Sequence, residues 1–245
     1  MIQRYLYLFG VWEPHLTRWM QGRLRPGDTF VDVGANVGYF SVLASCQVGS
    51  TGRVVSIEAS PRFHDVLAAN LRANECGNVR SVNTAVSDTV ERLTFYLENP
   101  ANLGGTTVVR PAGATQPAFE MTARTLPEIL TEEELRCARI IKIDVEGAEA
   151  AVVRGLAPAL DRLGPDAELV IEVGPERLAS QGRRVEEIID PLLKHGFHLY
   201  RLANDYEPHS YPPAMGNPVV PVRWRRPVTD DCDLVFSRID AEQLT

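Results

Sequence analysis

Residues 32–38 read Asp-Val-Gly-Ala-Asn-Val-Gly, and this stretch decides the fold. It overlaps the end of an apolar run, Thr29–Val33, that fits a buried strand, and it leads into a helical pattern over Val37–Cys46. The glycines permit a tight turn, and the helix that follows offers free N–H groups and the positive end of its dipole. A strand, a glycine-rich turn and a helix in this order predict a site for a nucleotide-like ligand.

The same alternation of short apolar runs and helical segments continues along most of the chain. It predicts an α/β fold, in which a mostly parallel sheet carries helices on both faces. The expected strands are Thr29–Val33, Arg53–Glu58, Val79–Asn83, Arg139–Asp144, Glu168–Glu172, His198–Leu202 and Asp233–Ser237. The expected helices are Val37–Cys46, Arg62–Asn74, Ala148–Gly155 and Val185–His195.

Two regions interrupt this alternation. Residues 93–124 contain further extended runs at 93–97 and 119–122, which we expect to pair as extra strands. Residues 203–231 are rich in proline and aromatic residues, and a long stretch of this kind inside a compact domain predicts a substrate lid. We expect one domain over 1–245 that begins with a helical segment at 1–27.

Composition excludes several classes of protein. A hydrophobic content of 44% over 245 residues is that of a globular chain, and a net charge of −7 removes the general attraction to nucleic acid. The four cysteines form no CxxC pair, so a zinc site or a disulfide framework is not expected. The apolar N-terminus is short and lacks a small-residue cleavage site, so we predict a cytoplasmic protein without a membrane span.

Acidic residues at strand ends indicate which ligand the glycine turn binds. Glu58 ends the second strand, where a carboxylate grips ribose hydroxyls in nucleotide-binding folds; alternatively it is only the acid that precedes a helix at Ser60-Pro61. Asp32 would repel the pyrophosphate of a dinucleotide and would attract a ligand with an ammonium and a sulfonium. S-adenosylmethionine is such a ligand.

A second constellation lies near residues 140–149 and 168–174. Lys142 and Asp144 share one face of a strand, and a buried lysine is either paired with a carboxylate or functional. Asp144 and Glu172 end neighbouring strands, so they could bind Mg²⁺ through oxygen, hold substrate hydroxyls, or supply a general base. The candidates for the base also include His209, Lys142 and Glu146.

The chain resembles the FkbM-type S-adenosylmethionine-dependent methyltransferases over roughly residues 13–200. The motifs that carry the resemblance are Asp-Val-Gly-Ala-Asn-Val-Gly at 32–38, Ile-Glu-Ala-Ser-Pro at 57–61, Asn-Thr-Ala-Val-Ser-Asp at 83–88, Asn-x-Gly-Gly at 102–105, Thr-Leu-Pro-Glu-Ile-Leu at 125–130 and Lys-Ile-Asp-Val-Glu-Gly at 142–147. Pro127 stands where relatives often carry Asp, which leaves any role of that acid open.

The resemblance implies a Rossmann-like, seven-stranded sheet whose last two strands form a C-terminal antiparallel hairpin. It also implies methylation of a hydroxyl on a sugar, glycan or polyketide, with S-adenosylmethionine as cofactor. By position, the implied cofactor-binding residues are Glu13, Asp32, Gly34, Asn36, Gly38, Glu58, Asn83, Ala85 and Asp144. Magnesium at Asp144 and Glu172 follows by analogy with small-molecule O-methyltransferases.

The region 203–231 favours a carbohydrate acceptor, because Tyr206, Tyr211 and Trp224 offer flat faces and the arginines at 223, 225 and 226 offer hydrogen bonds. A small-molecule or oligosaccharide acceptor, such as the precursor of a methylated-mannose polysaccharide, fits this pattern, as does an arginine-rich solvated edge without a ligand. We allow for a homodimer. The alternatives are an NAD(P)-dependent oxidoreductase, which shares the glycine turn, and a noncatalytic nucleotide-binding module.

Overall fold

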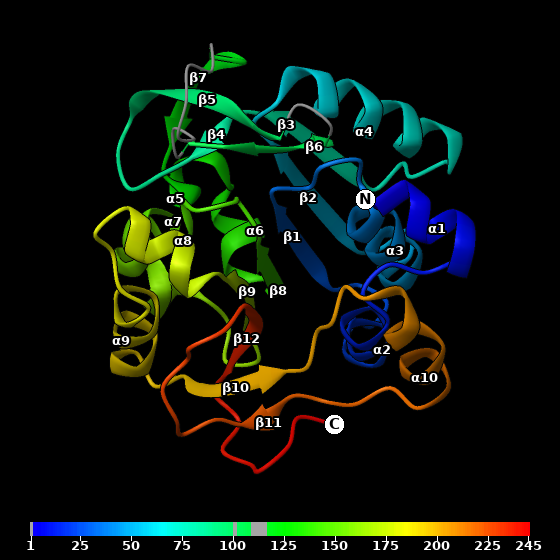
Figure 1. The fold of residues 1–245 in the computed structure, drawn as a ribbon, viewed down its shortest axis with the longest axis vertical. Helices are drawn as coiled ribbons and strands as arrows, with labels where there is room; N and C mark the ends of the chain where they lie inside the picture. The colour runs from blue at the N-terminus through cyan, green and yellow to red at the C-terminus, as the bar shows by residue number, and fades with distance from the viewer. Residues whose placement is uncertain (1, 100–101, 109–116) are drawn as a thin grey trace.

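The structure is a computed structural model that describes residues 2–99, 102–108 and 117–245. Its main sheet has the strand order β11-β10-β12-β9-β8-β1-β2-β3 (Figure 1). The strands are β1 (Thr29–Val33), β2 (Arg53–Glu58), β3 (Val79–Asn83), β8 (Ala138–Ile143), β9 (Glu168–Val173), β10 (His198–Leu202), β11 (Val222–Arg223) and β12 (Cys232–Ser237). The predicted α/β class is confirmed, with strand bounds within one residue of those expected.

The C-terminal strands complete one side of the sheet. Strands β3, β2, β1, β8 and β9 pair in parallel, whereas β12 pairs antiparallel with both β9 and β10 and lies between them. The predicted antiparallel hairpin is therefore present. The predicted count of seven strands is short by one, because the two-residue strand β11 pairs with β10 through Tyr200 and Arg223.

Helices cover both faces because the strands are apolar on both sides, as expected for a parallel sheet. On one face, Val31, Val55 and Ile141 pack with α5 (Leu126–Ile129), α6 (Glu132–Arg136), α7 (Glu149–Leu156) and α9 (Glu186–Lys194). On the other face, Phe30, Val54 and Ile140 pack with α2 (Pro14–Arg23) and α3 (Tyr39–Val48). Further helices are α1 (Ile2–Phe9), α4 (Pro61–Ala73), α8 (Pro175–Ser180) and α10 (Tyr211–Gly216), with single 3₁₀ segments at Ala157–Arg162 and Pro208–Ser210.

A smaller sheet lies beside the first and confirms the extra strands predicted in 93–124. Its order is β4-β7-β5-β6, with β4 (Ala85–Val86), β5 (Glu91–Asn99), β6 (Asn102–Thr107) and β7 (Phe119–Arg124). Phe95 of β5 stacks on Phe119 of β7 at 4.7 Å between ring centroids. This sheet lies over the end of the main sheet near α5 in Figure 1.

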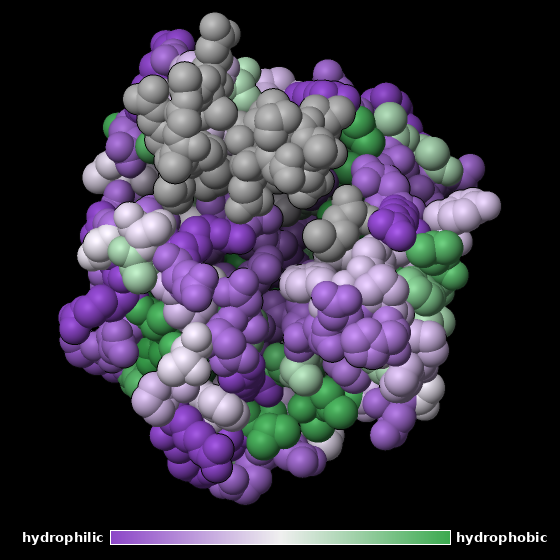
Figure 2. Space-filling view, in the orientation of Figure 1, coloured by the Kyte–Doolittle hydropathy of each residue, from purple (hydrophilic) through white to green (hydrophobic). Residues whose placement is uncertain are grey.

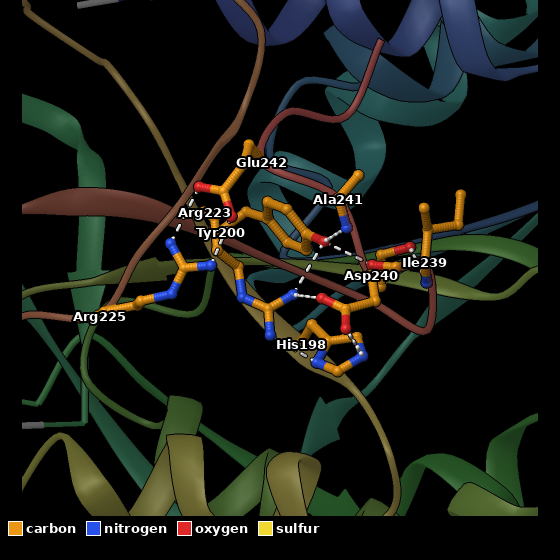
Figure 3. A network of polar contacts seen from close by, with 9 residues as sticks. His198, Tyr200, Arg223, Arg225, Ile239, Asp240, Ala241 and Glu242 are labelled. Atoms are coloured by element: carbon orange, nitrogen blue, oxygen red, sulfur yellow. Dashed lines mark hydrogen bonds and ion pairs between the residues drawn. The ribbon is translucent and has the colours of Figure 1, made fainter.

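A polar network ties the C-terminal residues to the outer strands (Figure 3). The Tyr200 hydroxyl accepts hydrogen bonds from Arg223 Nη1 at 3.1 Å and from the Ala241 backbone N–H at 3.0 Å. Arg223 also binds Asp240 at 2.8 Å, and its Nη2 lies 2.7 Å from His198 Nδ1. The network explains how so short a strand as β11 stays on the sheet. Within the described part of the chain, no helix combines the length and the apolar character needed to cross a bilayer.

Candidate functional site

A cavity of about 330 Å³ opens where the carboxyl ends of the parallel strands meet. Gly34, Glu58, Asp144 and Glu172, which end or follow β1, β2, β8 and β9, all line it. In the orientation of Figure 1, Figure 2 shows a hollow with hydrophilic walls between α8 and α1. Open α/β sheets bind ligands at the carboxyl ends of their strands. These four residues lie together at that edge, as expected from their positions at strand ends.

The glycine turn is shaped first by packing against the neighbouring strand. Gly34 has φ +86°, and a Cβ there would lie 1.8 Å from the backbone oxygen of Asp144. A side chain at this position would therefore collide with the loop that follows β8. Gly38 has φ +89° and packs against Leu67 rather than lining the cavity. Asn36, also at positive φ, does line it.

Glu58 is held in the cavity wall by two backbone donors. Its Oε2 accepts from the Asn36 N–H at 2.7 Å, and its Oε1 accepts from the Ser60 N–H at 2.8 Å. Burial raises the pKa of Glu58 to about 7, and these two N–H groups act against that rise. Because each carboxylate oxygen has a second lone pair, the fixed carboxyl can still accept a ligand hydroxyl. Glu58 thus serves both as the acid before α4 and as a cavity residue.

Asp144 and Glu172 form a pair of carboxyls at the opposite end of the cavity. Lys142 Nζ lies 2.7 Å from Asp144 Oδ2, and although burial alone would raise the pKa of Asp144, this ammonium holds it below its usual range. The pKa of Glu172 is raised well above its usual value, first by the charge of Asp144 and then by burial. The two side chains are hydrogen-bonded, and this contact favours a single proton held between them.

Glu13 and Tyr206 complete this end of the cavity from segments far apart in the chain. The Tyr206 hydroxyl donates to Glu13 Oε1 at 3.0 Å and lies 3.4 Å from Glu172 Oε1. Glu13 is 3% exposed, has φ +44°, and its Oε2 has no hydrogen-bond partner. Trp12 stacks on Tyr206 with 5.4 Å between ring centroids. The expected position of Glu13 near the ligand is therefore supported by its place in the cavity wall.

Asp32 and Lys142 lie behind the cavity wall rather than in it. Asp32 is 1% exposed and accepts a hydrogen bond from Ser41 Oγ at 2.6 Å, while burial raises its pKa. Burial alone would lower the pKa of Lys142, but Asp144, Glu13 and Asp32 hold it above its usual range. Neither residue lines the cavity, so both act on a ligand through their charge and through Asp144.

Of three further predicted residues, Asn83 and His209 do not line this cavity, whereas Glu146 does. Asn83 is exposed and donates to the Glu58 backbone oxygen at 2.8 Å, while its neighbours Thr84, Ala85 and Val86 line the cavity instead. His209 is exposed and does not line the cavity. Glu146 lines it and forms an ion pair with Arg177, another lining residue.

The aromatic residues of 203–231 do not gather into one flat binding surface. Tyr211 is fully buried against Tyr5 and Phe9 of α1. Trp224 packs on the core, with the Arg201 guanidinium 4.9 Å from the centroid of its ring. Tyr206 alone of the three lines the cavity. The spacing of residues in the sequence could not predict the hydrogen bond between Tyr206 and Glu13, because 193 positions separate the two.

The strand-end acids do not fit a magnesium ion. Asp144 Oδ2 is bound to the Lys142 ammonium, which also repels a cation, and Glu172 is hydrogen-bonded to Asp144, so the pair offers few free oxygens to an ion that prefers several oxygen ligands. Across residues 2–99, 102–108 and 117–245, no group of three or more His, Cys, Asp or Glu side chains is arranged to hold a metal ion. We therefore derive no step through a metal.

Comparisons with known proteins show the family to which the chain is similar. The family model "Methyltransferase FkbM domain" matches residues 32–199. The 31-O-demethyl-FK506 methyltransferase FkbM of Streptomyces tacrolimicus is 28% identical over 163 residues, covering 56% of this chain and 62% of that protein. The AMB antimetabolite synthetase AmbE of Pseudomonas aeruginosa is 26% identical over 210 residues, 72% of this chain and 10% of that protein. The chain thus spans less than two thirds of either relative.

Solved structures of methyltransferases superpose on the chain at low sequence identity. Methyltransferase FkbM from Methylobacillus flagellatus is 16% identical with a TM-score of 0.47, covering 91% of this chain and 50% of that one. An S-adenosylmethionine-dependent O-methyltransferase from Thermotoga maritima is 13% identical with a TM-score of 0.49, covering 95% and 68%.

Proposed function

Because the chain belongs to the FkbM methyltransferase family, we propose that it transfers the methyl group of S-adenosylmethionine to a hydroxyl oxygen of a sugar or a related natural product. The observation that carries the proposal is the proton-sharing pair of Asp144 and Glu172 in the wall of the same cavity that holds Glu58. One end of the cavity suits a ribose, and the other suits proton transfer from an alcohol. Family membership favours this reading over the oxidoreductase alternative.

The residues present fit the cofactor. S-adenosylmethionine carries an ammonium and a sulfonium. Glu13 lines the cavity, and its buried Oε2, which has no hydrogen-bond partner, is placed to accept from the ammonium. Asp32 and Asp144 add negative charge from beneath the glycine turn. Glu58 offers a fixed carboxyl to ribose hydroxyls, and the apolar side chains of Val86, Leu93 and Phe95 line the wall on the side of the smaller sheet.

When bound, S-adenosylmethionine supplies an electrophilic methyl carbon. An alcohol attacks it well only if its proton is removed as the new O–C bond forms and the S–C bond breaks. Lys142 keeps Asp144 ionised, and we infer that the Asp144–Glu172 pair takes up that proton. Positioning of the acceptor oxygen by the same carboxyls supplies a further part of the acceleration.

Calorimetric titration of S-adenosylmethionine and S-adenosylhomocysteine into the protein tests the cofactor assignment. Each titration is run with magnesium and again with EDTA. We expect binding of both ligands, with affinities that EDTA does not change, because the acid pair is occupied by Lys142 and a proton. If a folded sample binds neither ligand, the proposed function is wrong. If magnesium strengthens the binding and EDTA abolishes that gain, the metal-free assignment of Asp144 and Glu172 is wrong.

A further inference from the structure

A second, smaller cavity of about 170 Å³, which we call the side cavity, adjoins the cavity described above. The two share Glu172, Tyr206 and Asp231 as lining residues. The rest of the side cavity is lined by Asn204, Asp205 and Cys232, none of which lines the main cavity. A ligand in the side cavity would therefore meet Glu172 but neither Asp144 nor Glu58.

Tyr206 forms the partition between the two cavities. Its hydroxyl accepts from Asn204 Nδ2 at 2.9 Å on one side and donates to Glu13 Oε1 at 3.0 Å on the other. Asn204 is itself fixed, because it also donates to Asp233 Oδ2 at 2.9 Å. Glu172 lies at the same border, 3.4 Å from the Tyr206 hydroxyl. The groups that would orient a hydroxyl thus stand where the two cavities meet.

The walls of the side cavity are acidic and polar. Glu172, Asp205 and Asp231 contribute carboxyls, Asn204 an amide and Tyr206 a phenol, and none of the described residues that line it is basic. Carboxyls and amides hydrogen-bond well to hydroxyls, whereas they repel phosphate and carboxylate groups at short range.

We propose that the side cavity binds the part of the methyl acceptor next to its reactive hydroxyl, which itself lies in the main cavity beside Asp144, and that the side cavity accepts an uncharged polyhydroxylated ring and rejects a phosphorylated or carboxylated one. This inference rests on the proposed function, since it presumes a methyl acceptor. The inference adds to the proposed function the place where the acceptor binds and the absence of charge on the acceptor. Glu172 then contacts the acceptor, while Glu58 contacts the cofactor.

Ligand-observed saturation-transfer NMR tests the proposal with D-mannose and D-mannose 6-phosphate as probes. Both are added at equal concentration to protein saturated with S-adenosylhomocysteine, whose binding is measured calorimetrically in the same samples. We expect transfer to mannose and not to its phosphate. Cys232→Phe fills the side cavity from a residue outside the main cavity and should lower the mannose signal by about fivefold or more, the equivalent of roughly 1 kcal/mol. Cys46→Phe, at an exposed cysteine that lines neither cavity, should leave it unchanged.

A charge-reversal variant keeps the test decisive if Cys232→Phe does not fold. Asp205 is exposed and lines only the side cavity, so Asp205→Lys should fold and should now give saturation transfer to mannose 6-phosphate. The proposal is overturned if wild-type protein binds the phosphate as well as mannose, if it binds neither, or if mannose binding survives Cys232→Phe in a folded protein. Failure to bind S-adenosylhomocysteine would instead overturn the proposed function, so the two failures are distinguishable.

Discussion

Glu58 and Glu172 have the same side chain, lie at corresponding ends of two strands and line the same cavity, yet their surroundings differ. Glu58 is fixed by the backbone N–H groups of Asn36 and Ser60. Glu172 faces another carboxyl, Asp144, and a phenol, Tyr206. The strand end determines where each glutamate lies, and the neighbouring groups determine whether it holds a ligand or shares a proton.

The two ends of the cavity are also assembled differently. The Glu58 end consists of a local turn and two adjacent strands, so its geometry follows from residues close in sequence. The acid end brings together Glu13, Asp144, Glu172 and Tyr206 from four separate segments. We therefore expect substitutions at the first end to act on folding or on cofactor affinity, and those at the second to act on turnover and on the pH dependence of stability.

The largest effect is expected at Gly34, where the two ends touch. In Gly34→Ala the new Cβ would meet the Asp144 backbone oxygen, and φ is +86°, so the turn and the loop after β8 cannot both keep their places. We expect a loss of more than about 4 kcal/mol in the free energy of unfolding, or no soluble protein. Urea unfolding measures the loss.

Gly10→Ala is the matched control for this prediction. Gly10 also has positive φ, at +74°, but no atom lies within 4 Å of the position of its Cβ. Gly10→Ala should therefore lower the free energy of unfolding only by the strain of alanine in the left-handed conformation, about 1–2 kcal/mol. An equal cost at both glycines would show that the contact between the turn and β8 is unimportant.

The next largest effect is expected for Asp144→Asn. The substitution removes the charge that takes up the acceptor proton, and general-base groups contribute roughly 10²–10⁴-fold to rate. Turnover, followed as S-adenosylhomocysteine release with an acceptor, should fall by at least about 100-fold, while cofactor affinity changes far less. Asp88→Asn is the control, because Asp88 is also half-buried and paired with a cation, Arg154 at 2.9 Å, but lines neither cavity. Equal losses of turnover and affinity would place Asp144 in the cofactor site.

Glu58→Gln should weaken cofactor binding without unfolding the protein. The expected loss is about 1.5–3 kcal/mol at pH 8, since the charged acceptor of ribose hydroxyls is removed. The pKa of Glu58 is raised to about 7, so its charge is lost as the pH falls through 7. The affinity of the wild type for S-adenosylhomocysteine should fall over that range, and that of Glu58→Gln should stay level. A flat calorimetric profile for both would refute the ribose assignment.

The sequence predicted the residues at strand ends better than the contacts between distant segments, for physical reasons. Gly34, Glu58, Asp144 and Glu172 follow from strand ends in a parallel sheet, which period and polarity reveal. The partnership of Glu13 with Tyr206 joins residues 193 positions apart, and no local pattern encodes it. Asn83 and Ala85 were both predicted to contact the cofactor; Ala85 lines the cavity together with Thr84, whereas Asn83 is exposed and donates to the Glu58 backbone oxygen.

The smallest effect is expected for Glu13→Gln. The sign of its effect on the free energy of unfolding shows whether burial disfavours the charge at the acid end of the cavity. Burial raises the pKa of Glu13 from 4.5 to about 8. The folded protein thus holds this proton more tightly than the unfolded chain, and the resulting stability is complete below about pH 4.5 and is lost as the pH rises to 8. Glutamine mimics the protonated form, so Glu13→Gln should lie close to the wild type at pH 5 and should be the more stable protein at pH 9.

Urea unfolding of the unliganded protein at both pH values checks this difference, with Glu75→Gln as the control at a glutamate that is exposed and also has positive φ, +54°. The control should show no gain at pH 9, because an exposed carboxyl loses little solvation on folding. If Glu13→Gln destabilises the protein at pH 9, the Glu13 carboxylate is held by a favourable charge rather than strained by burial. Its unpartnered oxygen would then no longer point to a missing ligand.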